Sequence, residues 1–531
     1  MDKSFLRSLI FRHLDGIVTA PVISTLASKG ILHNIVVNKK STLSLLSEQF
    51  QTNEGYLNVA LRVLASQNMI QYTLDQSTNE VTIEVNKYSE RAFSNLEIYD
   101  DLFRFLKLEE VINRKDFSDD FCKKWVSLFD KYEGFLLSAN QEEYLEKPLH
   151  FQICKHIEGA LISPLIVRLG MSGLFHKYFM EASFSADEFH KNPVFFQKIL
   201  DRLVKLDWFV KVGKNYQFTE TGLFFARRAA AYGVTVSYLP MFSQLDDLLY
   251  GSPSKIREIK DGEDEKHVDR EMNVWGSGGA HSTYFKVIDE FIMDIFNRPL
   301  DEQPKGILDM GCGNGALLQH LYEVIERYTL RGRHLDDYPL FLVGADYNQA
   351  ALKVTRANLI KNDIWAKVIW GDIGDPDRLS EDLKSDYNIS LDELLNIRTF
   401  LDHNRIWGGT DQTNRVSTST GAYAFRGKRL ENSLVEESLK QHLQKWAPYV
   451  QRYGLLLIEL HTLSPDITSK NLGKTAATAY DATHGFSDQY ILEVDVFHQI
   501  CKEAGLNPDE KLFKKFPENN LATVSINYLK A

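Results

Sequence analysis

One stretch of the chain constrains its fold more than any other, the segment KGILDMGCGNGALLQHLYEVI at residues 305–325. Its first part, GILDM, has the composition of a short buried strand, and its last part, ALLQHLYEVI, has the periodicity of an amphipathic helix. The turn GCGNG between them has no bulky side chains. A strand, a glycine turn and a helix in this order begin a doubly wound α/β sheet, in which a ligand can approach the backbone beside the helix N-terminus.

Two kinds of cofactor compete for this glycine turn. The dinucleotide pattern GxGxxG/A is formally met by Gly311, Gly313 and Ala316, which is a weak signal when it stands alone. The alternative is S-adenosylmethionine, a sulfonium nucleoside that has no pyrophosphate and carries a cationic amino-acid end. An acid at the end of the first strand suits that end, and Asp309 lies two residues before Gly311.

Two further strands also end in acids. The strand in PLFLVGADYNQAAL (339–352) ends in Asp346, which can bind the two ribose hydroxyls, and the strand in AKVIWGDIGD (366–375) ends in Asp372, placed to meet the adenine amino group. Asp346 is further from the turn than the ~20 residues expected in a dinucleotide fold. Each acid could instead cap a helix, but glycines and not a helix follow Asp309. The pattern favours S-adenosylmethionine.

The segment NVWGSGGAHSTYF (273–285) has three glycines in four residues, followed by a predicted helix. This favours a close approach of a ligand to a helix N-terminus, with His281 and Tyr284 as pocket residues, although a plain domain linker fits the same composition. The full set of residues expected to hold the cofactor is Asp309, Gly311, Cys312, Gly313, Asn314, Gly315, Asp346, Tyr347, Gly371, Asp372, Ile373 and Tyr284.

The front half of the chain repeats itself. RHLDGIVTAPVISTLASKGILH at 12–33 matches KHIEGALISPLIVRLGMSGLFH at 155–176. Each copy is followed by a second amphipathic helix, at 56–70 and 195–209, and then by strand-like pieces, at 81–86 and 214–222. Helices followed by a short hairpin predict a winged-helix-like unit that occurs twice.

A winged helix often binds DNA, and the charge of this chain argues against that role. The net charge is −11, from 61 basic and 72 acidic residues, and the helix at 56–70 holds one basic residue, Arg62. A nucleic-acid binder needs a basic footprint. The paired units therefore favour a packing and dimerisation module that covers a substrate pocket, with no nucleic acid as partner and a homodimer allowed.

The length of 531 residues suggests about three domains. We expect an α/β fold: a Rossmann-like sheet, mostly parallel and seven-stranded, preceded by mostly helical, winged-helix-like repeats. The expected parts are a first winged-helix-like unit (1–91), a helical lid or spacer (92–150), a second winged-helix-like unit (151–252), a linker with a cofactor-proximal segment (253–284) and a catalytic core (285–531) with an insertion near 408–432.

The compartment is predicted from absences in the sequence. The four cysteines are scattered without a CxxC pair, the first residues carry charges where a signal peptide would be apolar, and no stretch approaches the ~18–20 apolar residues of a membrane span. We expect a cytoplasmic protein that has no membrane partner.

The segment IRTFLDHNR (397–405) follows the predicted fourth core strand. His403 is the candidate base, since a neutral imidazole accepts protons near pH 7, and Asp402 could orient it or bind a metal. Arg398 and Arg405 could hold a carboxylate in a bidentate manner, or could equally form ion pairs with Asp402. The predicted catalytic residues are His403, Asp402 and Arg398.

The chain resembles class I S-adenosylmethionine methyltransferases and, more narrowly, the starter-unit methyltransferases in the loading modules of apratoxin- and saxitoxin-type polyketide synthases. The segments that carry the resemblance are NVWGSGGAHSTYF, DMGCGNGALL, GADYNQAALK, GDIGDP, IRTFLDHNR and GFSDQY. The resemblance implies methyl transfer to the α-carbon of a malonyl group on an acyl carrier protein, which would be the partner.

Some of these relatives use a mononuclear iron or manganese centre, and the resemblance points to His484 and Gln489 as metal ligands. They lie in DATHGFSDQY (481–490), which also offers Asp481 and Asp488, and His461 is a weaker third candidate. Carboxylate, amide and imidazole groups suit iron or manganese, and a cation bound to both malonyl oxygens would stabilise the enolate. The competing interpretation is that His484 caps or packs a loop.

Two other functions stay open. The first is an O- or N-methyltransferase of a free small molecule that uses His403 as the base without a metal. The second is a regulatory or assembly subunit that binds the nucleoside and transfers nothing. The complete set of acids and glycines and the FLDH stretch count against the second.

Overall fold

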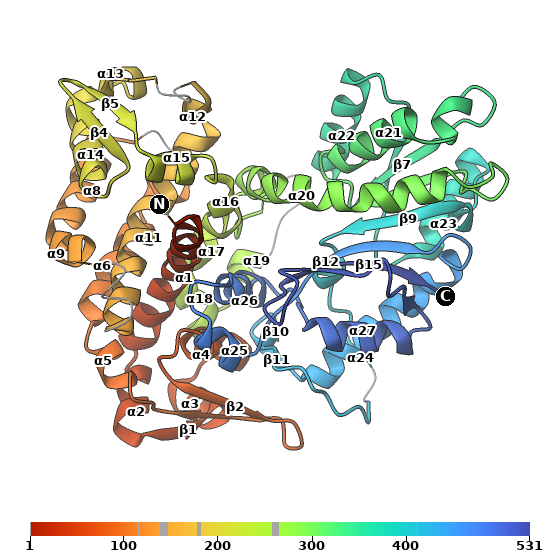
Figure 1. Ribbon diagram of the computed structural model, residues 1–531. Helices are drawn as coiled ribbons and strands as arrows, with labels where there is room; N and C mark the ends of the chain where they lie inside the picture. The colour runs from red at the N-terminus through yellow and green to blue at the C-terminus, as the bar shows by residue number, and fades with distance from the viewer. Residues whose placement is uncertain (1, 114–116, 139–146, 178–181, 258–264, 411–412) are drawn as a thin grey trace. The chain divides into compact units, whose positions relative to one another are not determined.

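The structure is a computed structural model, and it describes residues 2–113, 117–138, 147–177, 182–257, 265–410 and 413–531 (Figure 1). The chain forms two compact units. Unit 1 comprises Met1–Ala280, Ala422–Arg429 and Ser464–Asp488, and unit 2 comprises His281–Gly421, Leu430–Leu463 and Gln489–Ala531. Two segments from within the expected catalytic core therefore belong to unit 1.

The two sequence repeats form the long helices α1 (Lys3–Ser28) and α11 (Pro148–Met171) of unit 1. The helices cross at one glycine from each repeat. A Cβ atom on Gly16 would lie 2.5 Å from Cα of His156, and one on Gly159 would lie 2.5 Å from Cα of His13. The exchange is reciprocal, so the repeats pack on each other as equivalent halves, and only glycine allows this approach.

The same symmetry extends to the buried histidines of the repeats. Nδ1 of His13 is 2.9 Å from the hydroxyl of Tyr232, and Nδ1 of His156 is 3.0 Å from the hydroxyl of Tyr99. Both histidines are fully buried. Buried polar groups need partners, and each repeat meets that need with a tyrosine from another helix.

Each repeat is followed by a winged-helix-like arrangement. In the first, helices α3 (Leu43–Phe50) and α4 (Glu54–Ser66) accompany a three-stranded sheet in the order β1 (Lys40–Thr42), β3 (Glu80–Glu84), β2 (Gln71–Asp75). In the second, α13 (Ala186–Phe189) and α14 (Pro193–Lys205) accompany the hairpin β4 (Phe209–Val212) and β5 (Asn215–Phe218). Arg62, the basic residue of α4, is buried in an ion pair with Asp481 (2.9 Å).

The remaining elements of unit 1 are mostly helical. They are α2 (Ile31–Asn38), α5 (Ser89–Phe93), α6 (Leu96–Leu106), α7 (Glu109–Ile112), α8 (Asp119–Lys131), α9 (Glu133–Ser138), α12 (Leu174–Lys177), α15 (Glu220–Ala226), α16 (Ala230–Ser237), α17 (Leu239–Phe242), α18 (Leu245–Tyr250), α19 (Ser254–Arg257), α25 (Pro465–Lys470), α26 (Ala477–Gly485) and the hairpin β10 (Tyr423–Phe425) and β11 (Lys428–Leu430).

Among the described helices, α1 alone is long and apolar enough to cross a membrane by length and composition. This differs from the expectation that no stretch approaches such a length. The apolar window of α1 is 89% buried, as in the core helix of a globular unit.

Unit 2 is built on a mixed sheet. Its main path runs in the order β13 (Asn507–Pro508), β15 (Val524–Lys530), β12 (Leu455–Leu460), β9 (Leu394–Thr399), β6 (Gly306–Met310), β7 (Phe341–Asp346) and β8 (Ala366–Trp370), and β14 (Lys514–Phe516) pairs with β15. The strands from β12 to β8 are parallel, and β15 is antiparallel to β12. The predicted fold class, a Rossmann-like sheet behind helical winged-helix-like repeats, is confirmed.

Helices alternate with the parallel strands of unit 2. They are α20 (Arg270–Phe296, which begins in unit 1), α21 (Ala316–Tyr328), α22 (Gln349–Lys361), α23 (Pro376–Tyr387), α24 (Asn432–Trp446) and α27 (Val494–Glu503), with 3-10 turns η1 (Arg331–His334), η2 (Leu391–Glu393), η3 (Asp402–Asn404) and η4 (Ala447–Tyr449). Strand β6 has β7 on one side and β9 on the other, so the strand order reverses there. Ligands of such sheets bind at this reversal, outside the carboxyl ends of the strands.

One local prediction was wrong. The segment 273–285, expected as a glycine-rich stretch before a helix N-terminus, lies inside α20. Gly276 is there for packing, since a Cβ atom on it would lie 2.6 Å from the backbone nitrogen of Val234. The segment 408–432, expected as an insertion in the core, contains the hairpin of β10 and β11.

Candidate active site

The glycine turn after β6 uses backbone conformations that favour glycine. Gly311, Gly313 and Gly315 have φ values of +82°, +56° and +79°. A Cβ atom on Gly311 would also lie 2.9 Å from Cδ2 of Leu401. The turn thereby passes closely over the end of the sheet and leads into α21 at Ala316.

Asp346, at the end of β7, fastens this turn. Its Oδ2 accepts a hydrogen bond from the backbone N–H of Gly313 (3.0 Å), and its Oδ1 accepts one from the N–H of Asn348 (2.8 Å). The N–H groups of Gly311 and Cys312 both donate to the carbonyl of Ala345 (2.8 and 3.1 Å). The carboxyl ends of β6 and β7 are therefore held together with the carboxylate of Asp346 between them.

Asp309 is a buried acid without a hydrogen-bond partner for one of its oxygens in the described part of the chain. The residue is 1% exposed, and Oδ1 is the oxygen concerned. Burial first, and the nearby charge of Asp346 second, raise the pKa of Asp309 to about 7. A buried oxygen of this kind requires a donor, and a cationic amino group would both satisfy it and stabilise its charge.

The end of β8 lies next to the end of β7 at this site. The N–H of Gly371 donates to the carbonyl of Asp346 (3.2 Å), and Oδ1 of Asp372 accepts from the N–H of Gly374 (2.7 Å). The carbonyl of Ile373 accepts a hydrogen bond from Nε1 of Trp446 (2.8 Å). The predicted residues at the ends of β6, β7 and β8 thus meet at one edge of the sheet.

The other predicted cofactor residues, Cys312, Asn314, Tyr347 and Tyr284, differ in exposure and in side-chain partners. The Cys312 side chain is buried, 3.6 Å from Oγ1 of Thr355, and the Asn314 side chain caps the N–H of Ala316. Tyr347 is 58% exposed, with its ring 5.6 Å from that of Trp370. The ring of Tyr284 packs on Phe400, directly after β9, and on Phe516. Nothing is described of the His281 side chain.

His403 lies in η3, just after β9, and is paired with an acid that the sequence did not indicate. Its Nδ1 is 2.5 Å from Oε1 of Glu459, and its backbone N–H donates to Oε2 of the same residue (3.2 Å). Glu459 lies in β12 and is 2% exposed. Since the carboxylate accepts the Nδ1–H proton, the basic lone pair of the neutral ring is on Nε2.

Beside this pair is a cavity of about 10 Å³, lined by His403, Glu459, Leu460 and Tyr490 among others. Its volume is about that of one water molecule. The N–H of Tyr490 donates to the carbonyl of His403 (2.8 Å), which fixes the backbone that carries the imidazole.

Asp402 and Arg398 form a separate buried cluster. Both are 1% exposed, and Nη1 of Arg398 is 3.2 Å from Oδ1 of Asp402, which is also 3.1 Å from Nε2 of His442. The guanidinium of Arg398 lies 4.4 Å from the ring centre of Trp446. Burial raises the pKa of Asp402, but Arg398 and His442 hold it at about 2.

This geometry selects between the interpretations that the sequence left open. Arg398 is an ion-pair partner of Asp402, and Arg405 donates to the backbone carbonyls of Asp402 (3.0 Å) and Val435 (2.9 Å). Glu459, and not Asp402, makes the hydrogen bond that orients His403.

The residues predicted for the metal lie at the end of α26 and just after it, and His461 follows β12. His484, at the end of α26 in unit 1, has Nδ1 2.7 Å from the carbonyl of Tyr480, whereas Gln489 begins the next segment of unit 2. His461 is buried, with Nδ1 near the carbonyl of Leu492 (3.0 Å) and Nε2 near Oγ of Ser525 (2.6 Å).

The two acids of the same motif are also occupied. Asp481 pairs with Arg62, and Asp488 accepts a hydrogen bond from the hydroxyl of Tyr56 (2.7 Å). No group of three or more His, Cys, Asp or Glu side chains that could hold a metal ion occurs among the residues that the structure describes. Metal assistance, with His484 and Gln489 as ligands, stays a prediction of the resemblance.

Comparisons with known proteins bear on the whole chain. A family model described as the AprA MT2-like domain matches residues 265–527, one described as the AprA winged helix domain matches 158–252, and one described as the AprA N-terminal domain matches 6–72. Together these segments cover most of the chain. It is an S-adenosylmethionine-dependent methyltransferase of the AprA type.

The resemblance seen in the sequence is thereby confirmed for this AprA-type methyltransferase. A comparison with proteins of curated function gave no match. Solved structures that are similar include mitomycin 7-O-methyltransferase (12% identity, TM-score 0.43, covering 73% of this chain and 97% of that one), human N-acetylserotonin methyltransferase in complex with S-adenosylmethionine (11%, 0.41, 74% and 99%) and the CurJ carbon methyltransferase (13%, 0.34, 77% and 99%).

Proposed function

We propose that this AprA-type methyltransferase transfers a methyl group from S-adenosylmethionine to the α-carbon of a malonyl-type thioester on an acyl carrier protein, in polyketide-type biosynthesis. The observation that carries the proposal is the buried pair of His403 and Glu459 directly after β9. A carbon acid needs a positioned base, and the match to the AprA MT2-like domain over residues 265–527 supports an acceptor of the apratoxin kind.

The cofactor supplies an electrophilic methyl group on a sulfonium. In the proposed arrangement, the carboxylate of Asp346 binds the ribose hydroxyls, Asp309 meets the cationic amino-acid end, and Asp372 and the backbone at Ile373 border the adenine. The residues fit such a ligand, because Oδ1 of Asp309 is buried without a hydrogen-bond partner in the described chain and the glycines keep side chains away from the turn.

The proton of the acceptor is handled by His403. Nε2 takes the α-proton as the carbon attacks the methyl group and S-adenosylhomocysteine leaves. The carboxylate of Glu459, hydrogen-bonded to Nδ1–H, stabilises the resulting imidazolium. A positioned base of this kind contributes roughly 10²–10⁴-fold to a rate. Arg398 is ion-paired with Asp402, the first residue of η3, and in this proposal the pair does not itself contact the acceptor.

The test is incubation with malonyl-loaded carrier protein and isotopically labelled cofactor, read by intact mass. The label is expected in the acyl group. It should stay there after the thioester is reduced or hydrolysed, because a C–C bond holds the methyl group. Transfer only to free hydroxyl or amine acceptors would favour the O- or N-methyltransferase alternative, which the same His403–Glu459 pair also suits. Cofactor binding without any transfer would favour the regulatory subunit.

The metal predicted from the resemblance is tested in a separate arm with a chelator. Loss of transfer that iron or manganese restores would support a metal held by His484 and Gln489 together with further ligands. An unchanged rate would leave His403 and Glu459 as the groups that activate the acceptor.

The raised pKa of Asp309 predicts how cofactor affinity changes with pH. In the free protein this carboxyl has a pKa of about 7, and the cationic end of the cofactor lowers that pKa on binding. Affinity is therefore complete above pH 7 and falls as the pH drops below it, by up to about tenfold per unit. Calorimetry between pH 5.5 and pH 8 in buffers of different ionisation enthalpy measures both this fall and the proton released. Asp309→Asn should flatten the profile, and an equal slope in that variant would contradict the assignment.

A further inference from the structure

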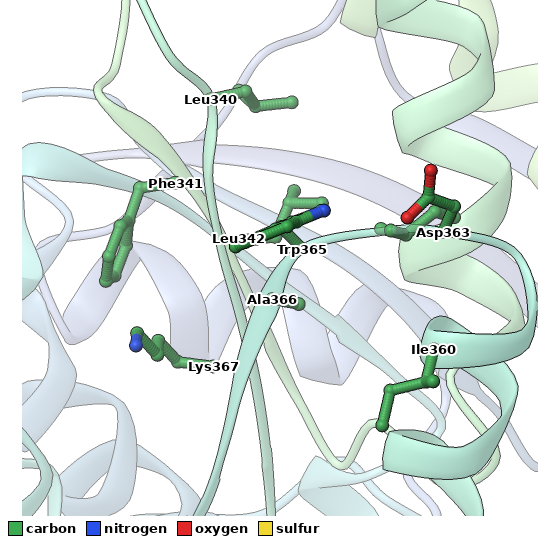
Figure 2. A pocket seen from close by; sticks show the side chains of 9 residues that line it. Leu340, Phe341, Leu342, Ile360, Asp363, Trp365, Ala366 and Lys367 are labelled. Atoms are coloured by element: carbon green, nitrogen blue, oxygen red, sulfur yellow. The ribbon is translucent and has the colours of Figure 1, made fainter.

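A groove in unit 2 lies at the start of strands β7 and β8, and it has no part in the site described above. It has a volume of about 510 Å³ and is shown in Figure 2. Its lining comprises Leu340, Phe341, Leu342, Ile360, Asp363, Ile364, Trp365, Ala366 and Lys367. Two of these apolar side chains face solvent, Trp365 at 87% and Ile360 at 77% exposure.

The groove and the cofactor residues are at opposite ends of the same strands. Phe341 and Ala366 begin β7 and β8, whereas Asp346 and Trp370 end them. At about 3.3 Å per residue, the two ends of β7 are separated by about 17 Å. A molecule seated in the groove therefore leaves the carboxyl edge of the sheet accessible.

The groove also lies at the open edge of the sheet. In the described chain, β8 pairs with β7 and with no other strand. Halfway along β8, Nη2 of Arg356 donates to the carbonyl of Val368 (2.7 Å), which covers the outward-facing backbone at that point. Edge strands are commonly protected by such covering groups. The Arg356 contact covers the middle of β8 and not its start, next to Trp365.

The charges around Trp365 are arranged symmetrically. Asp363 precedes it by two residues and Lys367 follows it by two, and the two side chains lie on either side of the indole (Figure 2). Neither forms an ion pair with another residue of the described chain. A two-fold axis near Trp365 would place the Lys367 ammonium of each chain opposite the Asp363 carboxylate of the other chain, so that two such pairs form.

We propose that this groove is the interface of a homodimer, in which Trp365 of each chain enters the groove of its partner and two Lys367–Asp363 pairs flank the axis. Large exposed apolar side chains beside a groove mark interaction sites. A second copy fits better than a carrier protein, because the groove carries both charges and because a carrier must deliver its substrate to His403, which follows the opposite end of the strands.

This interface differs from the one expected from the sequence. The repeat helices α1 and α11 already pack on each other within one chain, at Gly16 and Gly159. The face that a single repeat unit would offer to a second copy is therefore used inside unit 1.

The test is the mass in solution measured by light scattering over a range of concentrations. The unmodified full-length chain is expected at twice its 61.0 kDa. Trp365→Glu, Asp363→Lys and Lys367→Asp should each weaken the dimer by at least tenfold. The double variant Asp363→Lys/Lys367→Asp should restore it, because each exchanged charge meets its exchanged partner.

Val37→Glu is the matched control, since Val37 is 61% exposed in unit 1 and lies outside the groove. Thermal unfolding and cofactor affinity of each variant show whether the fold is retained, and both should be unchanged. A monomeric unmodified chain would overturn the proposal. So would a dimer that Trp365→Glu leaves intact, or a charge-exchanged double variant that is as weak as the single ones.

Discussion

His403→Ala is expected to lower kcat for methyl transfer by about 10²–10⁴-fold while the affinity for S-adenosylmethionine stays within a few-fold of the unmodified enzyme. The reason is the position of the imidazole. It follows the central strand β9, and it is oriented by Glu459 through a 2.5 Å hydrogen bond. Single-turnover rates and calorimetry measure the two quantities separately.

Glu459→Gln gives the companion result. The amide keeps the size of the carboxylate but loses the charge that stabilises the imidazolium, so a smaller loss of kcat than that of His403→Ala is expected. His334→Ala, an exposed histidine in η1 of the same unit, is the control and should have normal activity. A His403→Ala enzyme with unchanged kcat would remove His403 from the mechanism.

Asp346→Ala is expected to weaken S-adenosylmethionine binding by about 10²–10⁴-fold. Each hydrogen bond to a charged carboxylate contributes about 1.5–3 kcal/mol, and the ribose offers two hydroxyls. The same carboxylate accepts hydrogen bonds from the N–H groups of Gly313 and Asn348, so its removal also loosens the glycine turn.

The control for this change is Asp386→Ala, which removes an exposed acid at the end of α23 and should bind the cofactor normally. Circular dichroism and thermal unfolding separate a local loss of binding from a loss of the fold. Asp346→Asn keeps the acceptor oxygen, and an intermediate affinity is expected. An affinity within threefold of the unmodified enzyme for Asp346→Ala would contradict the ribose assignment.

The fold of unit 2 and its cofactor end were predictable because their signals are local. A strand, three glycines and a helix adjoin one another in the segment 305–325, and Asp346 and Asp372 each close an apolar strand. The carboxyl ends of parallel strands meet at one edge, so the order of the elements alone brings these acids together.

Glu459 was missed because its role depends on a contact across the sheet. It lies 56 residues from His403, and within LLLIEL it is a single acid among leucines and isoleucine. A charged residue inside a fully apolar strand is nonetheless the signal that could have indicated it, since such a residue is rarely buried without a partner.

In the segment DATHGFSDQY, by contrast, the sequence pointed to ligands that the structure shows in other contacts. Asp481 and Asp488 looked like ligands because of their residue type, but their partners, Arg62 and Tyr56, come from a helix more than 400 residues earlier in the chain. The pattern of a short motif does not distinguish an acid that binds a metal from one that pairs with a distant side chain of the same unit.

The segment 273–285 was misjudged for a related reason. Its glycines suggested an opening for a ligand, whereas Gly276 is required where α20 meets Gly233 of α16. A glycine that permits the close approach of another backbone has the same sequence signature as one that permits the approach of a ligand.

The most direct measurement is a crystal structure of the enzyme with S-adenosylhomocysteine bound. The ribose hydroxyls should lie on the carboxylate of Asp346, the amino-acid end should lie beside Asp309 and the glycine turn, and the sulfur should face Nε2 of His403. A nucleoside bound elsewhere, or oriented with its sulfur away from His403, would contradict both the cofactor site and the base.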